Sequence, residues 1–184
     1  MRTAPPSRTT ASEPSVVHPA FTLAAVEVHP AWIGSGAVTD SNSAQPRQDD
    51  DDPPTVLFLC VHNAGRSQMA LGWFNHLAAG RAVAWSGGSE PADQVNPAAV
   101  EAMAEVGIDI RGEQPKRWTD DIVRAADVVV TMGCGDACPV FPGKRYEDWE
   151  LEDPAGMGVD AVRPIRDEIE RRVRGLLASL GVDT

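Results

Sequence analysis

The sequence predicts an α/β fold in three layers, with a four-stranded parallel sheet flanked by helices. Two observations lead to this prediction. From Thr55 onward, short apolar runs alternate with segments of helical periodicity, which is the pattern of βαβ units around a parallel sheet. One of these runs contains three consecutive valines at 128–130, which suits a strand that is buried on both faces.

The first 54 residues differ from the rest of the chain. They are rich in proline, serine, threonine and alanine, and they end in four aspartates and two prolines at 49–54. A segment of this composition buries too little apolar surface to fold by itself. We therefore expect residues 1–54 to be a disordered or poorly ordered extension and residues 55–184 to be the folded domain.

Four elements are predicted in the first half of that domain. They are a buried strand over 56–60, a helix over 67–79, a strand over 81–85 and a helix over 98–106. The second strand is expected to end at the Ser86-Gly87-Gly88-Ser89 loop. The second helix has clear limits, because Asn96 is a favourable N-cap, Pro97 suits the first helical position and Gly107 stops the helix.

Four further elements are predicted in the second half. They are a short helix over 120–125, a strand over 127–132, a strand near 145–151 and an amphipathic helix from about 162 to 180. A loop rich in glycine and proline, residues 133–143, separates the last two strands. The domain thus alternates strands and helices to its end.

The composition limits which binding partners and which cellular compartment we expect for the protein. The formal net charge of −11 disfavours nucleic acid and anionic membranes as partners. The number of cysteines, three, is odd, and no signal peptide or membrane span is visible, which argues against a disulfide framework and for a reducing compartment. We expect a cytoplasmic protein whose cysteines are catalytic or metal-binding.

The candidate anion-binding loop is CVHNAGRS, residues 60–67, between the first strand and the first helix. In a loop of this size the backbone N–H groups can point inward, and the following helix adds its positive end. Cys60 would lie at the bottom as a nucleophile, because a nearby guanidinium and a helix N-terminus favour the thiolate. The residues expected to surround the oxyanion are Val61, His62, Asn63, Ala64, Gly65, Arg66 and Ser67.

Individual roles within this loop follow from side-chain chemistry. Arg66 offers a planar fork to two oxyanion oxygens, and Ser67 is placed to donate a hydrogen bond to the Cys60 sulfur. Asn63 tolerates left-handed geometry and is expected to hold the loop. His62 is more typical of a surface or packing residue than of a base. If Cys60 were merely a small core residue, Arg66 and Ser67 would have no explanation.

Asp153 is the candidate general acid. Attack on a tetrahedral oxyanion requires a proton for the departing oxygen, and a carboxylic acid on a loop beside the pocket can supply it. Asp153 follows the fourth predicted strand, and the loops beyond the carboxyl ends of parallel strands gather around one pocket. By composition alone it would be one acid among many, and a simple turn aspartate would be the better interpretation.

The other two cysteines, Cys134 and Cys138, directly follow the third predicted strand. Two thiols on a glycine-rich loop near a reactive cysteine suggest a relay, in which Cys134 attacks a sulfur adduct on Cys60 and Cys138 then takes over the disulfide. One alternative is a metal site, but two cysteines without a third cysteine or a histidine nearby make a poor zinc set. The other alternative is that both are incidental buried thiols.

At these residues the chain resembles the low-molecular-weight protein tyrosine phosphatase superfamily, and within it the arsenate reductases of that fold. The resemblance covers Thr55 to about Leu180. It rests on several motifs, which are Cys60, Asn63, Arg66 and Ser67 in the loop, the SQMA start of the helix, Asn96-Pro97 leading to VGIDI, and Asp153-Pro154. The resemblance implies that fold, oxyanion binding by the loop, attack by Cys60 and proton donation by Asp153.

Two departures from the phosphatase pattern favour the reductase branch. The phosphatases usually carry a second cysteine where this chain has Gly65, and aromatic residues where it has Ala155-Gly156. Without those rings a phosphotyrosine has no wall on which to stack, whereas a small oxyanion needs none. The arsenate reductases also carry two further cysteines after the third strand, where Cys134 and Cys138 fall.

The resemblance therefore implies reduction of arsenate to arsenite, with Cys60, Arg66, Asp153, Cys134 and Cys138 as the catalytic residues. It implies no bound cofactor or metal, and an external thiol reductant. The partner is either thioredoxin or, as in actinobacterial relatives with a similar cysteine spacing, mycothiol with a mycoredoxin. The alternative enzyme is a phosphatase that acts through a phosphocysteine at Cys60. A non-enzymatic alternative is an oxyanion-binding or redox-sensing module.

Overall fold

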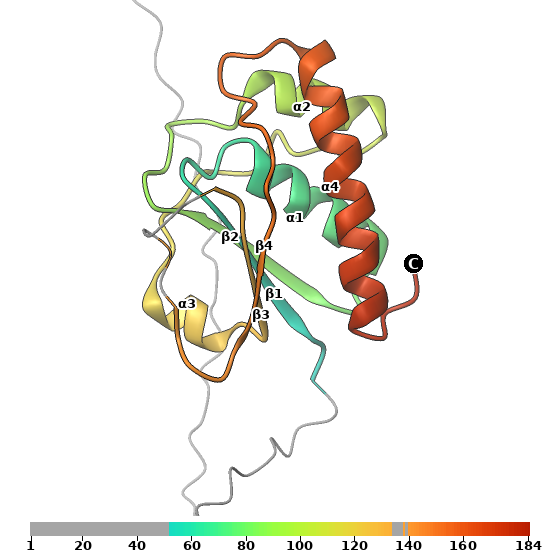
Figure 1. Ribbon diagram of the computed structural model, residues 1–184. Coiled ribbons are helices and arrows are strands. Elements are labelled where there is room, and N and C mark those ends of the chain that lie inside the picture. The colour runs from blue at the N-terminus through green and yellow to red at the C-terminus, as the bar shows by residue number, and fades with distance from the viewer. Residues whose placement is uncertain (1–51, 134–137, 139) are drawn as a thin grey trace, which may run out of the picture. The chain divides into compact units, whose positions relative to one another are not determined.

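The computed structural model of the protein describes residues 52–133, 138 and 140–184, and in them the chain forms a four-stranded parallel sheet (Figure 1). The strands are β1 (Thr55–Cys60), β2 (Val83–Gly88), β3 (Val128–Thr131) and β4 (Arg145–Asp148). They lie in the order β2-β1-β3-β4, and every neighbouring pair is parallel. The predicted fold class is confirmed.

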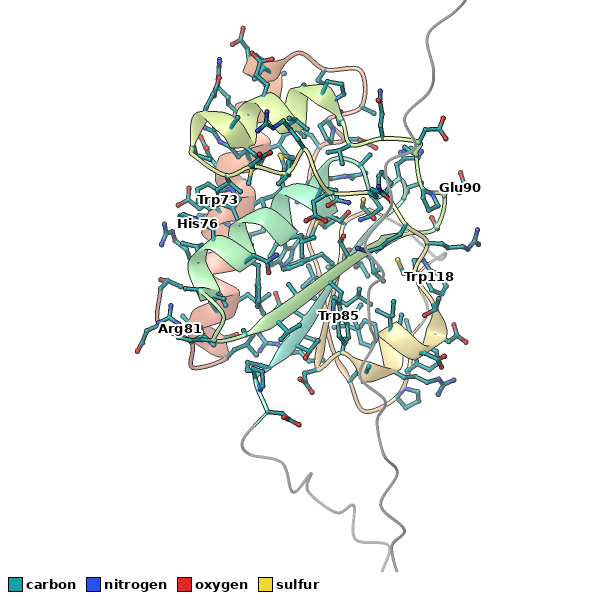
Figure 2. The ribbon with its side chains drawn as sticks, turned by 180° about the vertical axis from the view of Figure 1, so that it is seen from behind. Trp73, His76, Arg81, Trp85, Glu90 and Trp118 are labelled. Carbon is teal, nitrogen blue, oxygen red and sulfur yellow. The ribbon has the colours of Figure 1, made fainter. Side chains whose placement is uncertain are left out.

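Helices cover both faces of this sheet, which gives the three layers. They are α1 (Arg66–Ala78), α2 (Pro97–Glu105), α3 (Asp120–Ala125) and α4 (Val159–Ser179). Helices α1, α2 and α4 pack on one face and α3 on the other (Figure 1). Seen from behind, Trp73 belongs to the α1 side, and Trp85 and Trp118 to the α3 side (Figure 2). In the described part of the chain, no helix has the length and apolarity needed to cross a membrane.

Strand β1 is the centre of the fold. Its side chains alternate between the two layers, since Phe58 and Cys60 join the cluster under α1 and α4, whereas Leu57 and Leu59 join the cluster over α3. All four are almost completely buried, as expected for a strand with a neighbour on each edge and a helical layer on each face. Cys60 is therefore held at the carboxyl end of a central strand, directly before the loop to α1.

The second strand differs from the prediction, because it runs over Val83–Gly88 and includes residues that were expected to form a loop. The reason is a close approach of backbones. The N–H of Gly88 donates to the carbonyl of Lys116 at 2.9 Å, and a Cβ atom on Gly88 would lie 2.5 Å from the carbonyl oxygen of Val61. A glycine inside a strand can mark a place where another backbone comes close. Here β2 at Gly88 lies against the segments that contain Val61 and Lys116.

The remaining boundaries shift by a few residues. Strand β4 ends at Asp148, three residues earlier than predicted, and α4 begins at Val159 and contains Pro164. A proline inside a helix removes one backbone hydrogen bond. The helix forms nevertheless because its apolar face, which includes Val162 and Ile165, is buried against α1 and α2. The N-cap of α2 is as predicted, since the Asn96 side chain accepts from the N–H groups of the first turn.

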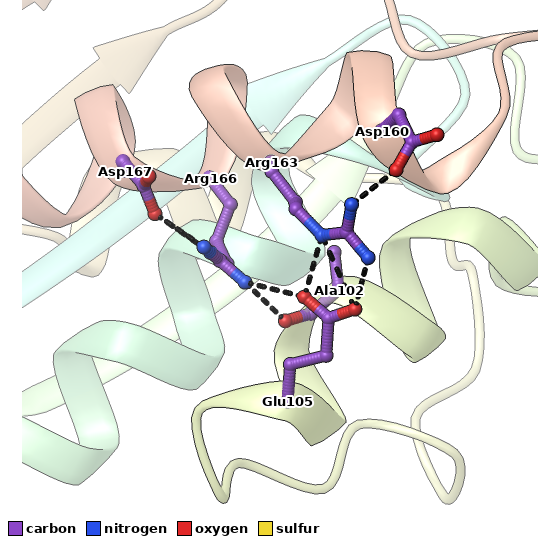
Figure 3. A network of polar contacts seen from close by, with 6 residues as sticks. All are labelled: Ala102, Glu105, Asp160, Arg163, Arg166 and Asp167. Atoms are coloured by element: carbon purple, nitrogen blue, oxygen red, sulfur yellow. Dashed lines mark hydrogen bonds and ion pairs between the residues drawn. The ribbon is translucent and has the colours of Figure 1, made fainter.

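A network of charged side chains joins α2 to α4 (Figure 3). Glu105 on α2 accepts hydrogen bonds from Arg163 at 2.8 Å and 2.6 Å and from Arg166 at 3.2 Å. Arg166 is buried, and it also donates to the carbonyl of Ala102 at 2.8 Å. Hydrogen bonds depend on orientation more strongly than apolar packing does, so these bonds set the orientation of α2 relative to α4.

This network makes the folded state sensitive to acid. Hydrogen bonds and charge from Arg163, joined by those from Arg166, lower the pKa of Glu105 below its ordinary value of 4.5. The Glu105 carboxylate therefore binds a proton more readily in the unfolded chain than in the folded one. The stabilisation that Glu105 contributes is complete above pH 4.5, and it is lost as the pH falls towards the lowered pKa.

We predict that Glu105→Gln lowers the melting temperature at pH 7, and that the difference from the unsubstituted protein shrinks as the pH falls below 4.5. Thermal unfolding followed by circular dichroism across this range measures it. Glu101→Gln is the matched control on the same helix, since no ion pair of Glu101 occurs within the described residues. A melting difference for Glu105→Gln that stays constant down to low pH would contradict the assignment.

Candidate active site

The loop from Cys60 to Ser67 folds back on the sulfur of Cys60. The backbone N–H of Asn63 donates to this sulfur at 3.2 Å, and the Ser67 hydroxyl lies 3.0 Å from it. Cys60 is a free thiol and is buried. Two hydrogen-bonding groups and the amino-terminal end of α1 thus converge on one sulfur.

The direction of the hydrogen bonds follows from a third partner. The Asn63 side-chain nitrogen, which can only donate, lies 2.9 Å from the Ser67 hydroxyl oxygen. The hydroxyl accepts that bond, so its own hydrogen is free to point at Cys60. The hydrogen bonds then run from Asn63 to Ser67 and from Ser67 to the Cys60 sulfur, which is the contact that the sequence predicts for Ser67.

Asn63 holds the loop in a conformation that few residues adopt. Its φ of 48° lies in the left-handed region, and its side chain is completely buried. Its side-chain oxygen accepts the backbone N–H of Lys116 at 2.9 Å, and its carbonyl accepts the Gln68 side chain at 3.0 Å. The sequence indicates a structural role for Asn63, but Gln68 and Lys116 carry no local signal that would identify them as its partners.

Arg66 and Asp153 meet although 87 residues separate them. The guanidinium is buried, and its Nη2 lies 2.9 Å from a carboxylate oxygen of Asp153, whose side chain is 47% exposed. Its Nη1 donates to the carbonyl of Leu151 at 3.3 Å. The other side of the guanidinium lies against Gly133, where a Cβ atom would come within 2.8 Å of Nη1. The structure thus brings the predicted clamp and the predicted acid together.

A small pocket opens above the sulfur. Its lining residues come from the loop, from the start of α2 and from the segment after β4, and they are Cys60, His62, Ala64, Gly65, Arg66, Asn96, Asp153, Pro154 and Ala155. Val61, Asn63 and Ser67, which were also expected around the oxyanion, do not line it. Val61 instead packs on the cluster over α3. His62 is exposed at the rim, where a groove of about 540 Å³ adjoins the pocket.

Asn96 and Pro154 are two site residues whose position the sequence did not reveal. The Asn96 side-chain nitrogen donates to the carbonyl of Pro154 at 3.0 Å, and the Asn96 backbone N–H donates to the carbonyl of Ala64 at 2.8 Å. Pro154 is buried against the loop, because a Cβ atom on Gly65 would lie 2.5 Å from its ring. The N-cap signal and the Asp-Pro pair were the available hints, but neither predicts that the two segments touch.

The two additional cysteines are described unequally. Cys134 lies outside the described residues. Cys138 is buried among residues of the cluster over α3 and is disulfide-bonded, whereas Cys60 is a free thiol. Across the described ranges, no group of three histidine, cysteine, aspartate or glutamate side chains could hold a metal ion.

Residues 55–184, which contain the site, are similar to a known protein family and to several named proteins. The profile of the low molecular weight phosphotyrosine protein phosphatase family matches residues 55–184. Arsenate reductase 2 of Staphylococcus epidermidis is 40% identical over 126 residues, which are 66% of this chain and 95% of that protein. The glutaredoxin arsenate reductase of a Synechocystis species is 38% identical over 128 residues, which are 68% of this chain and 97% of that protein.

A solved structure extends the comparison. The thioredoxin-dependent arsenate reductase of Corynebacterium glutamicum shares 46% identity with a TM-score of 0.64. The match covers 72% of this chain and 64% of that one, so the chain spans less than two thirds of that structure.

The Asn63 geometry yields a test by two substitutions. Asn63→Gly keeps the left-handed backbone accessible but removes the bonds to Ser67 and Lys116, and we expect it to lower the free energy of unfolding by about 1 to 3 kcal/mol. Asn63→Ala removes the same bonds and adds strain of roughly 1 kcal/mol, since alanine is unfavourable at positive φ. Urea unfolding measures both values. Greater stability of Asn63→Ala than of Asn63→Gly would show that the backbone at residue 63 is not strained, because alanine is favoured over glycine where no strain opposes it.

Proposed function

The chain belongs to the low molecular weight phosphotyrosine protein phosphatase family, and on this basis we propose that it is an arsenate reductase that serves in arsenic detoxification. One observation supports this most strongly. A buried thiol, a buried guanidinium and a carboxyl group meet in one small pocket, and the chain is about 40% identical to proteins that bear this name. We assign the reaction to residues 55–184, the range that the family profile matches.

The first step joins sulfur to arsenic. The Cys60 thiolate attacks arsenate, an As–S bond forms, and one As–O bond breaks. Arg66 holds two of the remaining oxygens. When the oxyanion takes the guanidinium, the Asp153 carboxyl group is released from its ion pair with Arg66. It is then able to carry the proton that lets the departing oxygen leave as water.

The next steps reduce arsenic and regenerate the nucleophile. Cys134 attacks the sulfur of Cys60, the S–S bond forms, and the As–S bonding pair stays on arsenic, which leaves as arsenite. Cys138 then attacks the Cys134 sulfur and releases Cys60 as a thiolate. The disulfide at Cys138 and the free thiol at Cys60 are the sulfur states that this sequence leaves behind.

An external thiol reductant then returns the last disulfide to two thiols, and no bound cofactor takes part. The relatives named thioredoxin-dependent and glutaredoxin arsenate reductase support a reductant of this class. Within it we propose thioredoxin, with mycothiol and a mycoredoxin as the second candidate. The reducing cytoplasm is the compartment that fits this chemistry.

The pocket walls favour a small oxyanion over phosphotyrosine. Among the residues that the structure describes, no phenylalanine, tyrosine or tryptophan lines the pocket. Ala155 and Gly156, directly after the acid and its proline, are exposed and offer no ring for stacking. The proposed arsenate reductase therefore needs no aromatic wall and uses all three cysteines. A phosphatase would leave Cys134 and Cys138 unused.

We predict arsenate-dependent oxidation of NADPH by the purified protein with thioredoxin and thioredoxin reductase, or with mycothiol, mycoredoxin and its reductase. Cys60→Ser abolishes it because the nucleophile is lost, and Asp153→Asn lowers it by about 100-fold or more because the acid is lost. Hydrolysis of p-nitrophenyl phosphate is measured in parallel. Failure of both donor systems, together with robust phosphate ester hydrolysis, would refute the proposal.

We predict that Cys138→Ser retains the first chemical step but loses turnover with thioredoxin. The variant can form the Cys60–Cys134 disulfide and release one arsenite for each protein molecule, because Cys138 acts only after that release. Arsenite released in a single turnover, compared with steady-state turnover, measures this. Full steady-state activity of Cys138→Ser with thioredoxin would contradict the relay.

A further inference from the structure

The segment that carries Asp153 has no regular structure of its own. Residues 149–158 form neither helix nor strand. Within this segment Asp153 accepts the N–H of Ala155 at 3.1 Å, and Met157 donates to the carbonyl of Pro154 at 3.1 Å. These are local turns, and they do not fix where the carboxyl group lies relative to the Cys60 sulfur. That position depends on contacts to other parts of the fold.

Arg66 supplies such contacts. It donates to Asp153 and to the carbonyl of Leu151. Under the proposed function, however, the oxyanion occupies the guanidinium, and the bond to Asp153 is given up at the moment when the acid is needed. Another anchor must then keep Asp153 beside the departing oxygen.

Asn96 provides an anchor that does not involve the oxyanion-binding atoms of Arg66. Its side-chain oxygen accepts the N–H groups of Ala98 at 2.9 Å and Ala99 at 3.3 Å. Because both of those partners are donors, the orientation of the amide is determined, and its nitrogen faces the carbonyl of Pro154. One side chain thus caps α2 and holds the residue next to the acid.

Asn96 is itself firmly placed. Its backbone N–H donates to the carbonyl of Ala64 in the oxyanion loop, and α2 is locked on α4 through Arg166 and Glu105 (Figure 3). The ring of Pro154 also rests against Gly65. The acid segment is therefore tied, at Pro154, to the same loop that carries the nucleophile.

We propose that Asn96 is a positioning residue for the general acid Asp153. Through its hydrogen bond to the carbonyl of Pro154, Asn96 keeps the Asp153 carboxyl group close to the Cys60 sulfur. This inference rests on the proposed arsenate reductase function. It makes Asn96 part of the chemical step although it does not itself donate the proton. A displacement of the acid by about 1 Å is enough to cost on the order of 100-fold in rate.

The test is Asn96→Ser, alone and combined with Asp153→Asn. Serine is a comparable N-cap, so α2 keeps its cap, but its side chain is too short to reach Pro154. We expect kcat for arsenate reduction to fall by about tenfold or more, with KM for arsenate within about twofold, since Arg66 and the loop are unchanged. In the Asp153→Asn background, the same change should have almost no further effect.

Two further variants separate positioning from stability. Thr119→Ala removes the N-cap of α3, which lies on the other face of the sheet, and should leave kcat unchanged. Asn96→Asp keeps a good N-cap but has no hydrogen for the carbonyl of Pro154, so its kcat should fall at least as far as that of Asn96→Ser. Its added charge also raises KM. This variant decides the matter if Asn96→Ser does not fold.

The outcomes distinguish the two proposals. No arsenate reduction by the unsubstituted protein would overturn the proposed function. If that protein is active, unchanged kcat in Asn96→Ser or Asn96→Asp would overturn the role of Asn96. An equal fold-loss with and without Asp153 would do the same, because it would show that Asn96 acts independently of the acid.

Discussion

The buried charge of Arg66 is the constraint around which the site is organised. A guanidinium removed from water is costly unless an anion and hydrogen-bond acceptors surround it. These are the Asp153 carboxylate and the Leu151 carbonyl, both on the segment after β4. Arg66 therefore also determines where the segment with Asp153 lies, and under the proposed function the oxyanion would replace one anion with another.

The parallel sheet makes this arrangement possible. Strands β1 and β3 are neighbours, and β4 is the next strand outward. Because the strands are parallel, the segments that follow all three begin at the same end of the sheet, where the carboxyl ends of the strands lie. Cys60 ends β1, Gly133 follows β3 and lies against Arg66, and Asp153 follows β4. Chain topology thus brings Cys60, Arg66 and Asp153, the proposed nucleophile, clamp and acid, together from distant parts of the sequence.

Two asparagines connect the segments that the sheet leaves adjacent. Asn63 ties the oxyanion loop to Lys116, and Asn96 ties it, through the start of α2, to Pro154. Each uses its side-chain oxygen to accept a backbone N–H and its side-chain nitrogen to donate, which an ionised aspartate cannot do because it has no donor. The loops of the site are held by these amides rather than by regular secondary structure.

The sequence by itself determined the alternation of strands and helices and the position of the loop between β1 and α1 that carries Cys60 and Arg66. These follow from local patterns, namely apolar periodicity, the Asn96-Pro97 helix start and the spacing of Cys60 and Arg66. Only the tertiary structure decided that Gly87 and Gly88 continue a strand, that Arg66 pairs with Asp153 and that Asn96 contacts Pro154. Each of these depends on the approach of segments far apart in the chain, and no local preference encodes which backbone a glycine or an amide will meet.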